Sequence, residues 1–148
     1  MSILFPTQQE ADSLIAMEKH YHGSMVFNFP LPSERCVVPL ISADKKHGFQ
    51  LDINRGRIKL TQATFQTRTK EVVVLVRLDV DGRPHTNPDD EVILSPHIHL
   101  YREGFHDKWA YPLPLGVFSD LSDLFATLDD FMAYCKIVSK PSFQKAVV

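Results

Sequence analysis

The sequence is poor in cysteine: Cys36 and Cys135 are its only two, and they lie far apart. They form no C-x-x-C pattern, which argues against a zinc site built from cysteine. We expect two buried, reduced thiols of the kind that persists in the cytoplasm, where we place the protein.

Long apolar runs and secretion signals are also missing. No run approaches the roughly 20 residues that a membrane-spanning helix needs. The start, MSILFPTQQE, has no basic segment and no small-residue cleavage site, so we expect no signal peptide and no membrane contact. The sequence contains neither a glycine-rich phosphate loop nor a G-x-S-x-G motif, so it does not support the chemistry of either motif.

What is present suits an ordinary globular protein of 148 residues, 44% of them hydrophobic and 23% charged. This length predicts a single domain, residues 1–148, with a core of its own. The net charge is −2, but residues 45–83 carry nine Lys and Arg against four Asp and Glu. Such asymmetry indicates a half that faces nucleic acid, and a solvated sheet face explains it equally well.

Two segments have the pattern of helices. PTQQEADSLIAMEKHYHG predicts a helix over about 8–22, because Thr7 and Glu10 form a capping-box pattern. SDLSDLFATLDDFMAYCKI predicts an amphipathic helix over about 120–137, with Ser119 as its N-cap. We expect this second helix to cover one face of a sheet.

The region between them, residues 35–113, contains five or six short apolar or alternating segments with short connections. We therefore predict an α+β fold, with an antiparallel meander of five to six strands between an N-terminal and a C-terminal helix. The one long connection is DGRPHTNPDDEVILSP at 81–96, and loops of this length often carry function.

The densest chemistry follows directly, in SPHIHLYREGFHDKWAYPL at 95–113. Alternate side chains of a strand share a face, and two residues span roughly 6.6 Å. One face then carries His97, His99, Tyr101 and Glu103. Ile98 and Leu100 would pack in the core, so we expect the histidines on the more accessible side, close enough to reach one ion or one phosphate.

The first hypothesis is a metal-dependent enzyme for small molecules. His97, His99 and Glu103 offer two imidazoles and a carboxylate, which suit one divalent transition metal such as Zn, Mn, Fe or Ni. HIHLYRE is similar to the first metal motif of cupins, H-x-H-x(3,4)-E. The glycines that bracket the cupin motif and the later P-x-G-x-x-H segment are both missing.

The leading hypothesis needs no cofactor: a small RNA-binding protein, in its strongest form a metal-independent endoribonuclease of toxin type. One histidine would take the 2′-OH proton and another would protonate the leaving oxygen. The candidate catalytic residues are His97, His99, His85, Tyr101 and Arg102. The candidate RNA contacts are Arg55, Arg57, Lys59, Arg68, Arg77, Lys108 and Trp109.

The alternative is a non-enzymatic protein-interaction module, a phage accessory or defence modulator, that uses the face of Trp109 and Tyr111. In that case the histidine face has only a structural role. Aromatic residues at alternate strand positions are more often packing residues than nucleotide platforms.

GRPHTNPDDE and SPHIHLYREGFHDKWAYPLP together resemble an uncharacterised bacterial and phage-associated family with P-H-x-N-P, P-H-x-H-x-Y-R-E-G and D-K-W-A segments. This resemblance implies no activity. VRLDVDGRPH and PHIH more weakly resemble the TumE-like toxins of toxin–antitoxin modules, which implies RNA-directed activity and an antitoxin partner. The positions concerned are Arg77, Asp79, His85, His97 and His99. Those toxins close on adjacent histidines and a lysine, whereas here H-x-H continues into Y-R-E-G.

Overall fold

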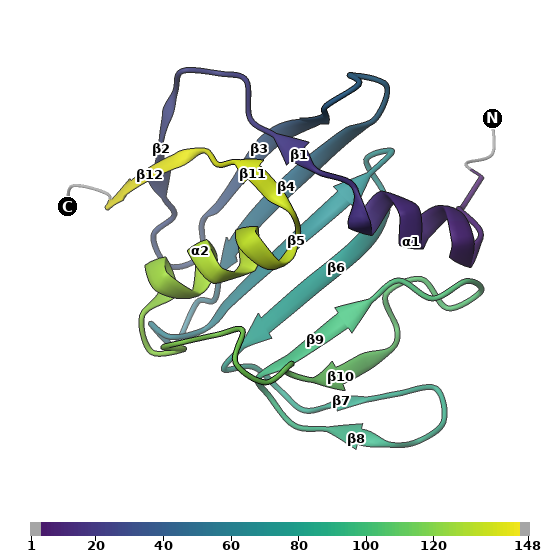
Figure 1. Ribbon diagram of the computed structural model, residues 1–148. Coiled ribbons are helices and arrows are strands. Elements are labelled where there is room, and N and C mark those ends of the chain that lie inside the picture. The colour runs from purple at the N-terminus through teal and green to yellow at the C-terminus, as the bar shows by residue number, and fades with distance from the viewer. Residues whose placement is uncertain (1–3, 146–148) are drawn as a thin grey trace.

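An eight-stranded sheet dominates the computed structural model, which describes residues 4–145 (Figure 1). Six of its strands form an antiparallel meander in the order β10–β9–β6–β5–β4–β3. They are β3 (Arg35–Ser42), β4 (Gly48–Arg55), β5 (Ala63–Thr69), β6 (Val73–Val80), β9 (His97–Leu100) and β10 (Ala110–Pro112). The predicted α+β class and the largely antiparallel sheet are confirmed.

The sheet is larger than predicted because two strands from outside residues 35–113 extend it. β1 (Lys19–His20) pairs antiparallel with β3 and parallel with β11 (Ile137–Ser139). β2 (Val26–Phe29) and β12 (Ser142–Lys145) form a separate parallel pair. Early and late segments of the chain therefore lie side by side (Figure 1).

The first helix, α1 (Gln8–Ala16), has the predicted capping box of Thr7 and Glu10 but ends earlier than predicted. Its C-cap, Met17, is already extended. The chain leaves the helix there because Lys19 and His20 take strand partners. The Lys19 ammonium is buried and donates to the carbonyls of Ile15, Met17 and Cys135, so the sharp exit is stabilised.

The second helix, α2 (Leu124–Tyr134), is shorter than predicted at both ends. Asp123 is its N-cap and accepts from two backbone amides, whereas the predicted cap, Ser119, binds Asp130 through its amide and hydroxyl. Lys136, with a φ of 62°, turns the chain out of the helix and into β11.

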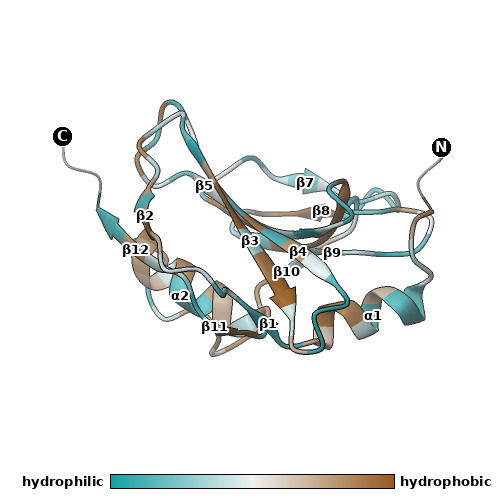
Figure 2. Ribbon diagram, turned by 90° about the horizontal axis from the view of Figure 1, so that it is seen from above, coloured by the Kyte–Doolittle hydropathy of each residue, from teal (hydrophilic) through white to brown (hydrophobic). Residues whose placement is uncertain are grey.

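The two helices lie on one side of the sheet, and the hairpin of β7 (His85–Thr86) and β8 (Val92–Ile93) lies on the other (Figure 2). The main core fills the helix side, where Phe131 of α2 packs 6.0 Å from the ring of Phe65 on β5. Cys36 and Cys135 are free thiols, half-buried and buried respectively. Among residues 4–145, no helix has the length and apolarity to span a membrane.

Candidate metal centre

Four polar side chains meet on the sheet face opposite the helices. β6 and β9 are neighbours, and their register places Arg77 across from His99 and Asp79 across from His97. The alternate positions, Leu78 and Ile98, are buried in the main core. Strand alternation therefore presents all four polar side chains on one face.

Asp79 lies at the centre of this group. Its Oδ2 is 3.1 Å from Nε2 of His97 and 3.2 Å from Nε2 of His99. His85, on the hairpin, brings its ring centroid to 4.6 Å from that of His99 and 6.0 Å from that of His97. The structure thus brings together His85, His97 and His99, which the sequence suggested as catalytic residues. They surround Asp79, which was named only because of the resemblance to TumE-like toxins.

Contrary to expectation, the two strand histidines are buried. His97 and His99 are each 1% exposed, whereas the Asp79 side chain remains 21% exposed. The connection at 81–96 folds back as the β7–β8 hairpin and places His85 against them. A strand face that would otherwise meet solvent is covered by a segment of the same chain.

Backbone carbonyls set the protonation of both buried imidazoles. Nδ1 of His97 lies 3.2 Å from the carbonyl oxygen of Leu94, and Nδ1 of His99 lies 2.8 Å from that of Asp107. A carbonyl oxygen only accepts, so each Nδ1 carries a hydrogen and donates it. In the neutral rings both Nε2 lone pairs then point toward Asp79, the arrangement that positions histidines as metal ligands.

Arg77 orients the carboxylate from the other side. Its Nε donates to Oδ1 of Asp79 at 3.1 Å, and its Nη1 donates to Asp107 at 2.7 Å. Its Nη2 lies 3.0 Å from Nε2 of His99. The two carboxylates and one guanidinium leave a net charge of about −1 when the histidines are neutral, which favours a bound cation.

The Asp79 carboxyl and the His97 imidazole both have lowered pKa values. Burial raises the pKa of the Asp79 carboxyl, but the hydrogen bond with His99 and the charges of Arg77, His99 and His97 outweigh it and lower the pKa to about 2. Burial also lowers the pKa of His97 below its ordinary value. Near neutral pH the group therefore offers an ionised carboxylate and a neutral His97 imidazole.

The geometry suits a small transition-metal ion. One donor atom from each of Asp79, His97 and His99 lies within 4.8 Å of the others. Ligands bound about 2.0–2.1 Å from a tetrahedral ion lie roughly 3.3 Å apart, close to the separations of Oδ2 from the two nitrogens. Three protein ligands leave a further position for water or substrate, as in catalytic zinc sites.

A sequence model described as "Family of unknown function (DUF6978)" matches residues 7–137. The chain belongs to this family. The predicted membership in an uncharacterised family is confirmed, while the resemblance to TumE-like toxins stays a prediction. No curated protein and no solved structure matches the chain.

Within the range that matches DUF6978, the P-H-x-N-P segment docks onto the D-K-W-A segment. Nε2 of His85 lies 2.7 Å from the carbonyl oxygen of Lys108. The Asn87 amide pairs with the backbone of Ala110, donating to its oxygen at 2.9 Å and accepting from its nitrogen at 2.8 Å. These contacts hold the hairpin over the histidines, and Asn87 is a residue that sequence reasoning missed.

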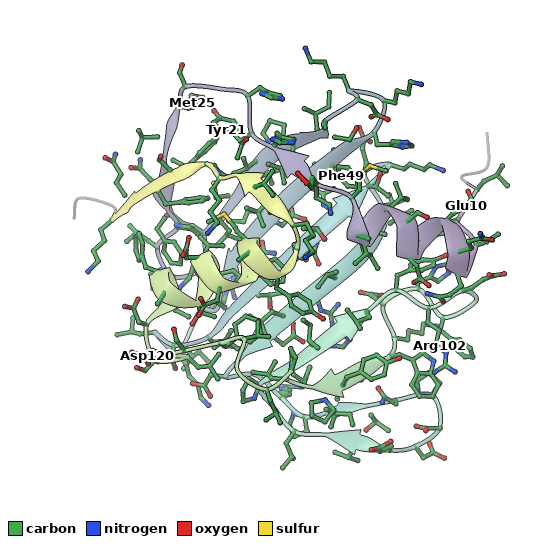
Figure 3. The ribbon with its side chains drawn as sticks, viewed as in Figure 1. Glu10, Tyr21, Met25, Phe49, Arg102 and Asp120 are labelled. Atoms are coloured by element: carbon green, nitrogen blue, oxygen red, sulfur yellow. The ribbon has the colours of Figure 1, made fainter. Side chains whose placement is uncertain are left out.

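Three of the residues predicted beside the histidines lie elsewhere. Regular pairing of β9 ends at Leu100, after which Tyr101 is buried and donates its hydroxyl to the carbonyl of Pro6. Glu103 accepts from the amide of Gln8 at the start of α1, so it does not complete the predicted metal set. Arg102 stacks 4.2 Å from the Trp109 ring centroid, beyond the end of β9 (Figure 3).

The candidate RNA contacts are spread over the molecule, and several already have partners. Arg68 binds the buried carboxylate of Asp52, and Arg55 donates to two backbone carbonyls. Lys59 pairs with Asp81, and Arg77 belongs to the candidate metal centre. The remaining candidates are half-buried or exposed: Arg57, Lys108 and Trp109.

Proposed function

We propose that this member of DUF6978 is a metal-dependent enzyme whose ion is held by Asp79, His97 and His99. One observation carries the proposal: both Nε2 atoms converge on one carboxylate oxygen while both Nδ1 atoms donate to backbone carbonyls. Without a cation, the neutral His97 imidazole in this state would direct its Nε2 lone pair at the carboxylate, while that of His99 would be shared between the carboxylate and Nη2 of Arg77. A metal ion removes that repulsion.

Metal-assisted hydrolysis is the reaction class that this ligand set supports best. Two histidines and one carboxylate resemble in type the ligands of catalytic zinc sites, which keep a water molecule in the remaining position. Such an ion lowers the pKa of bound water to about 7, which makes hydroxide available near neutrality. Asp79 lines a cavity, so the centre is open on that side.

Arg77 would accommodate the ion by moving one of its nitrogens, Nη2. Its Nη2 now lies 3.0 Å from Nε2 of His99 and 3.5 Å from Oδ2 of Asp79, two atoms that would bind the metal. Its other donors contact Oδ1 of Asp79 and Asp107, neither of which is a proposed ligand atom. Arg77 would then orient Asp79 from outside the coordination sphere.

The test is a titration of the metal-free protein with Zn²⁺ and with Co²⁺, followed by calorimetry and by visible absorption. The wild type should bind one ion per chain, with Co²⁺ bands typical of low coordination number. Asp79→Asn and His97→Ala should weaken binding at least 100-fold. Asp81→Asn, which removes a nearby carboxylate outside the triad, should leave it unchanged. Equal affinity in Asp79→Asn and the wild type would refute the centre.

Metal-independent cleavage of RNA is the second candidate, and the position of Arg77 favours it. The guanidinium already contacts His99, so a protein cation occupies part of the space that an ion would fill. His85 and His97 line the same cavity and could exchange protons with a ribose phosphate there. This candidate predicts RNA cleavage that resists chelators, weakens with salt and disappears in His97→Ala.

A further inference from the structure

A small polar cavity of about 250 Å³ adjoins the proposed metal centre. Its walls come from the ends of β5 and β6 and from the connection that follows β6. The polar side chains among its lining residues are Gln62, Thr64, Asp79, Arg83, His85 and His97. Only one of them, Asp79, is an acid.

We infer that this cavity binds the phosphate group of a phosphate-ester substrate, with Arg83 as the main contact; the inference rests on the proposed metal centre. Arg83 is an exposed residue that lines the cavity, so its charge carries no desolvation cost of burial. Gln62 and Thr64 add an amide and a hydroxyl, and donors of this kind recognise phosphate oxygens.

A bound metal ion would change the net charge around the cavity. Without an ion, the positive charge of Arg83 is balanced by the net negative charge of Asp79, Asp107 and Arg77 taken together. A divalent ion on Asp79 leaves an excess of positive charge, so phosphate should bind the loaded protein more tightly than the metal-free protein. By reciprocity, phosphate should tighten metal binding by the same factor.

The cavity is smaller than typical sites for drug-sized ligands, so we expect it to hold the phosphate group and only a small part of the esterified alcohol. In the reaction, the oxygen of the metal-bound water would bond to phosphorus and the bond from phosphorus to the alcohol oxygen would break. The alcohol oxygen would take up the proton that the water loses. A small phosphomonoester and the phosphodiester of a nucleic acid share this chemistry.

The experiment titrates inorganic phosphate into the Co²⁺-loaded protein and records the visible spectrum and the heat. Wild type should bind phosphate, and Arg83→Gln should weaken that binding at least tenfold while the Co²⁺ affinity stays within twofold. Arg57→Gln, an exposed arginine that does not line the cavity, is the matched control. Co²⁺ binding with no phosphate response that depends on Arg83 overturns this inference alone, whereas no Co²⁺ binding overturns the metal centre as well.

Rates of ester hydrolysis distinguish the two possible sources of the phosphate group, a small phosphomonoester and a nucleic-acid phosphodiester. p-Nitrophenyl phosphate and bis(p-nitrophenyl) phosphate report hydrolysis of a monoester and a diester through the same coloured product. Faster turnover of the monoester supports a small metabolite as substrate, and faster turnover of the diester supports a nucleic-acid backbone. A loaded protein that binds phosphate through Arg83 but hydrolyses neither ester keeps the phosphate site and refutes hydrolysis.

Discussion

Asn87→Ala should release the β7–β8 hairpin from the edge of the sheet. Asn87 is 4% exposed, and its amide makes two hydrogen bonds with the backbone of Ala110, which is 1% exposed. Alanine would leave the nitrogen and the oxygen of Ala110 buried without these partners. Each such loss costs about 1–3 kcal/mol, so we expect a cost of about 2–4 kcal/mol after local relaxation.

Hydrogen exchange and thermal unfolding together measure this effect. The Ala110 amide should lose protection, and the melting temperature should fall by about 5–15 °C if the hairpin unfolds with the rest of the domain. If only the hairpin detaches, exchange at Ala110 will accelerate with a small change in melting temperature. In either case the buried histidines become accessible to diethyl pyrocarbonate.

Thr86→Ala is the matched control, because Thr86 is the exposed neighbour of Asn87 on the same hairpin. It should change neither exchange nor melting. If Asn87→Ala behaves like Thr86→Ala in all three measurements, the Asn87 side chain does not hold the hairpin, and the account of the covered histidines is wrong.

The remaining predictions concern ion pairs, pH and metal. Asp52→Ala should lower the free energy of unfolding, measured in urea, by about 3–5 kcal/mol, because it leaves the partly buried Arg68 guanidinium without its carboxylate partner. Lys59→Met, which breaks the exposed pair with Asp81, should lower it by only about 0–1 kcal/mol. Burial lowers the pKa of Lys19 from 10.5 to about 8, so between these pH values the unfolded chain holds a proton that the folded chain has released. Stability should therefore rise with pH across that window, and Lys19→Met should remove the rise. Zn²⁺ should raise the melting temperature of the wild type, and excess chelator should reverse the shift, with no effect of either on Asp79→Asn.

Local patterns predicted those parts of the fold that local physics determines. Alternation in β5 follows its burial, where every second residue from Ala63 to Thr69 is buried. The capping box at Thr7 was also correct. The helix ends were wrong because Lys19 and Ile137 find strand partners on distant segments, and such pairing leaves no signal in a short window of sequence.

The candidate site was also predicted only in part. Strand alternation correctly predicted that His97 and His99 share a face. Glu103 was preferred to Asp79 because it follows the histidines in the sequence, but the strand ends before it. The spacing of Arg77 and Asp79, two residues apart on the neighbouring strand, could have identified the carboxylate once the β6–β9 pairing was assumed. The burial of both histidines depends on a hairpin whose docking no periodicity reveals.

The parallel pairing of β1 with β11 has a consequence for synthesis on the ribosome. The open edge of β1 stays unpaired until Ile137–Ser139 have been translated and have emerged. During that interval the nascent chain presents unsatisfied backbone donors and acceptors, the kind of edge at which other chains add. The outer edge of the sheet is therefore completed only after residue 139 has emerged, and we expect ribosome-bound intermediates that lack β11 to engage chaperones.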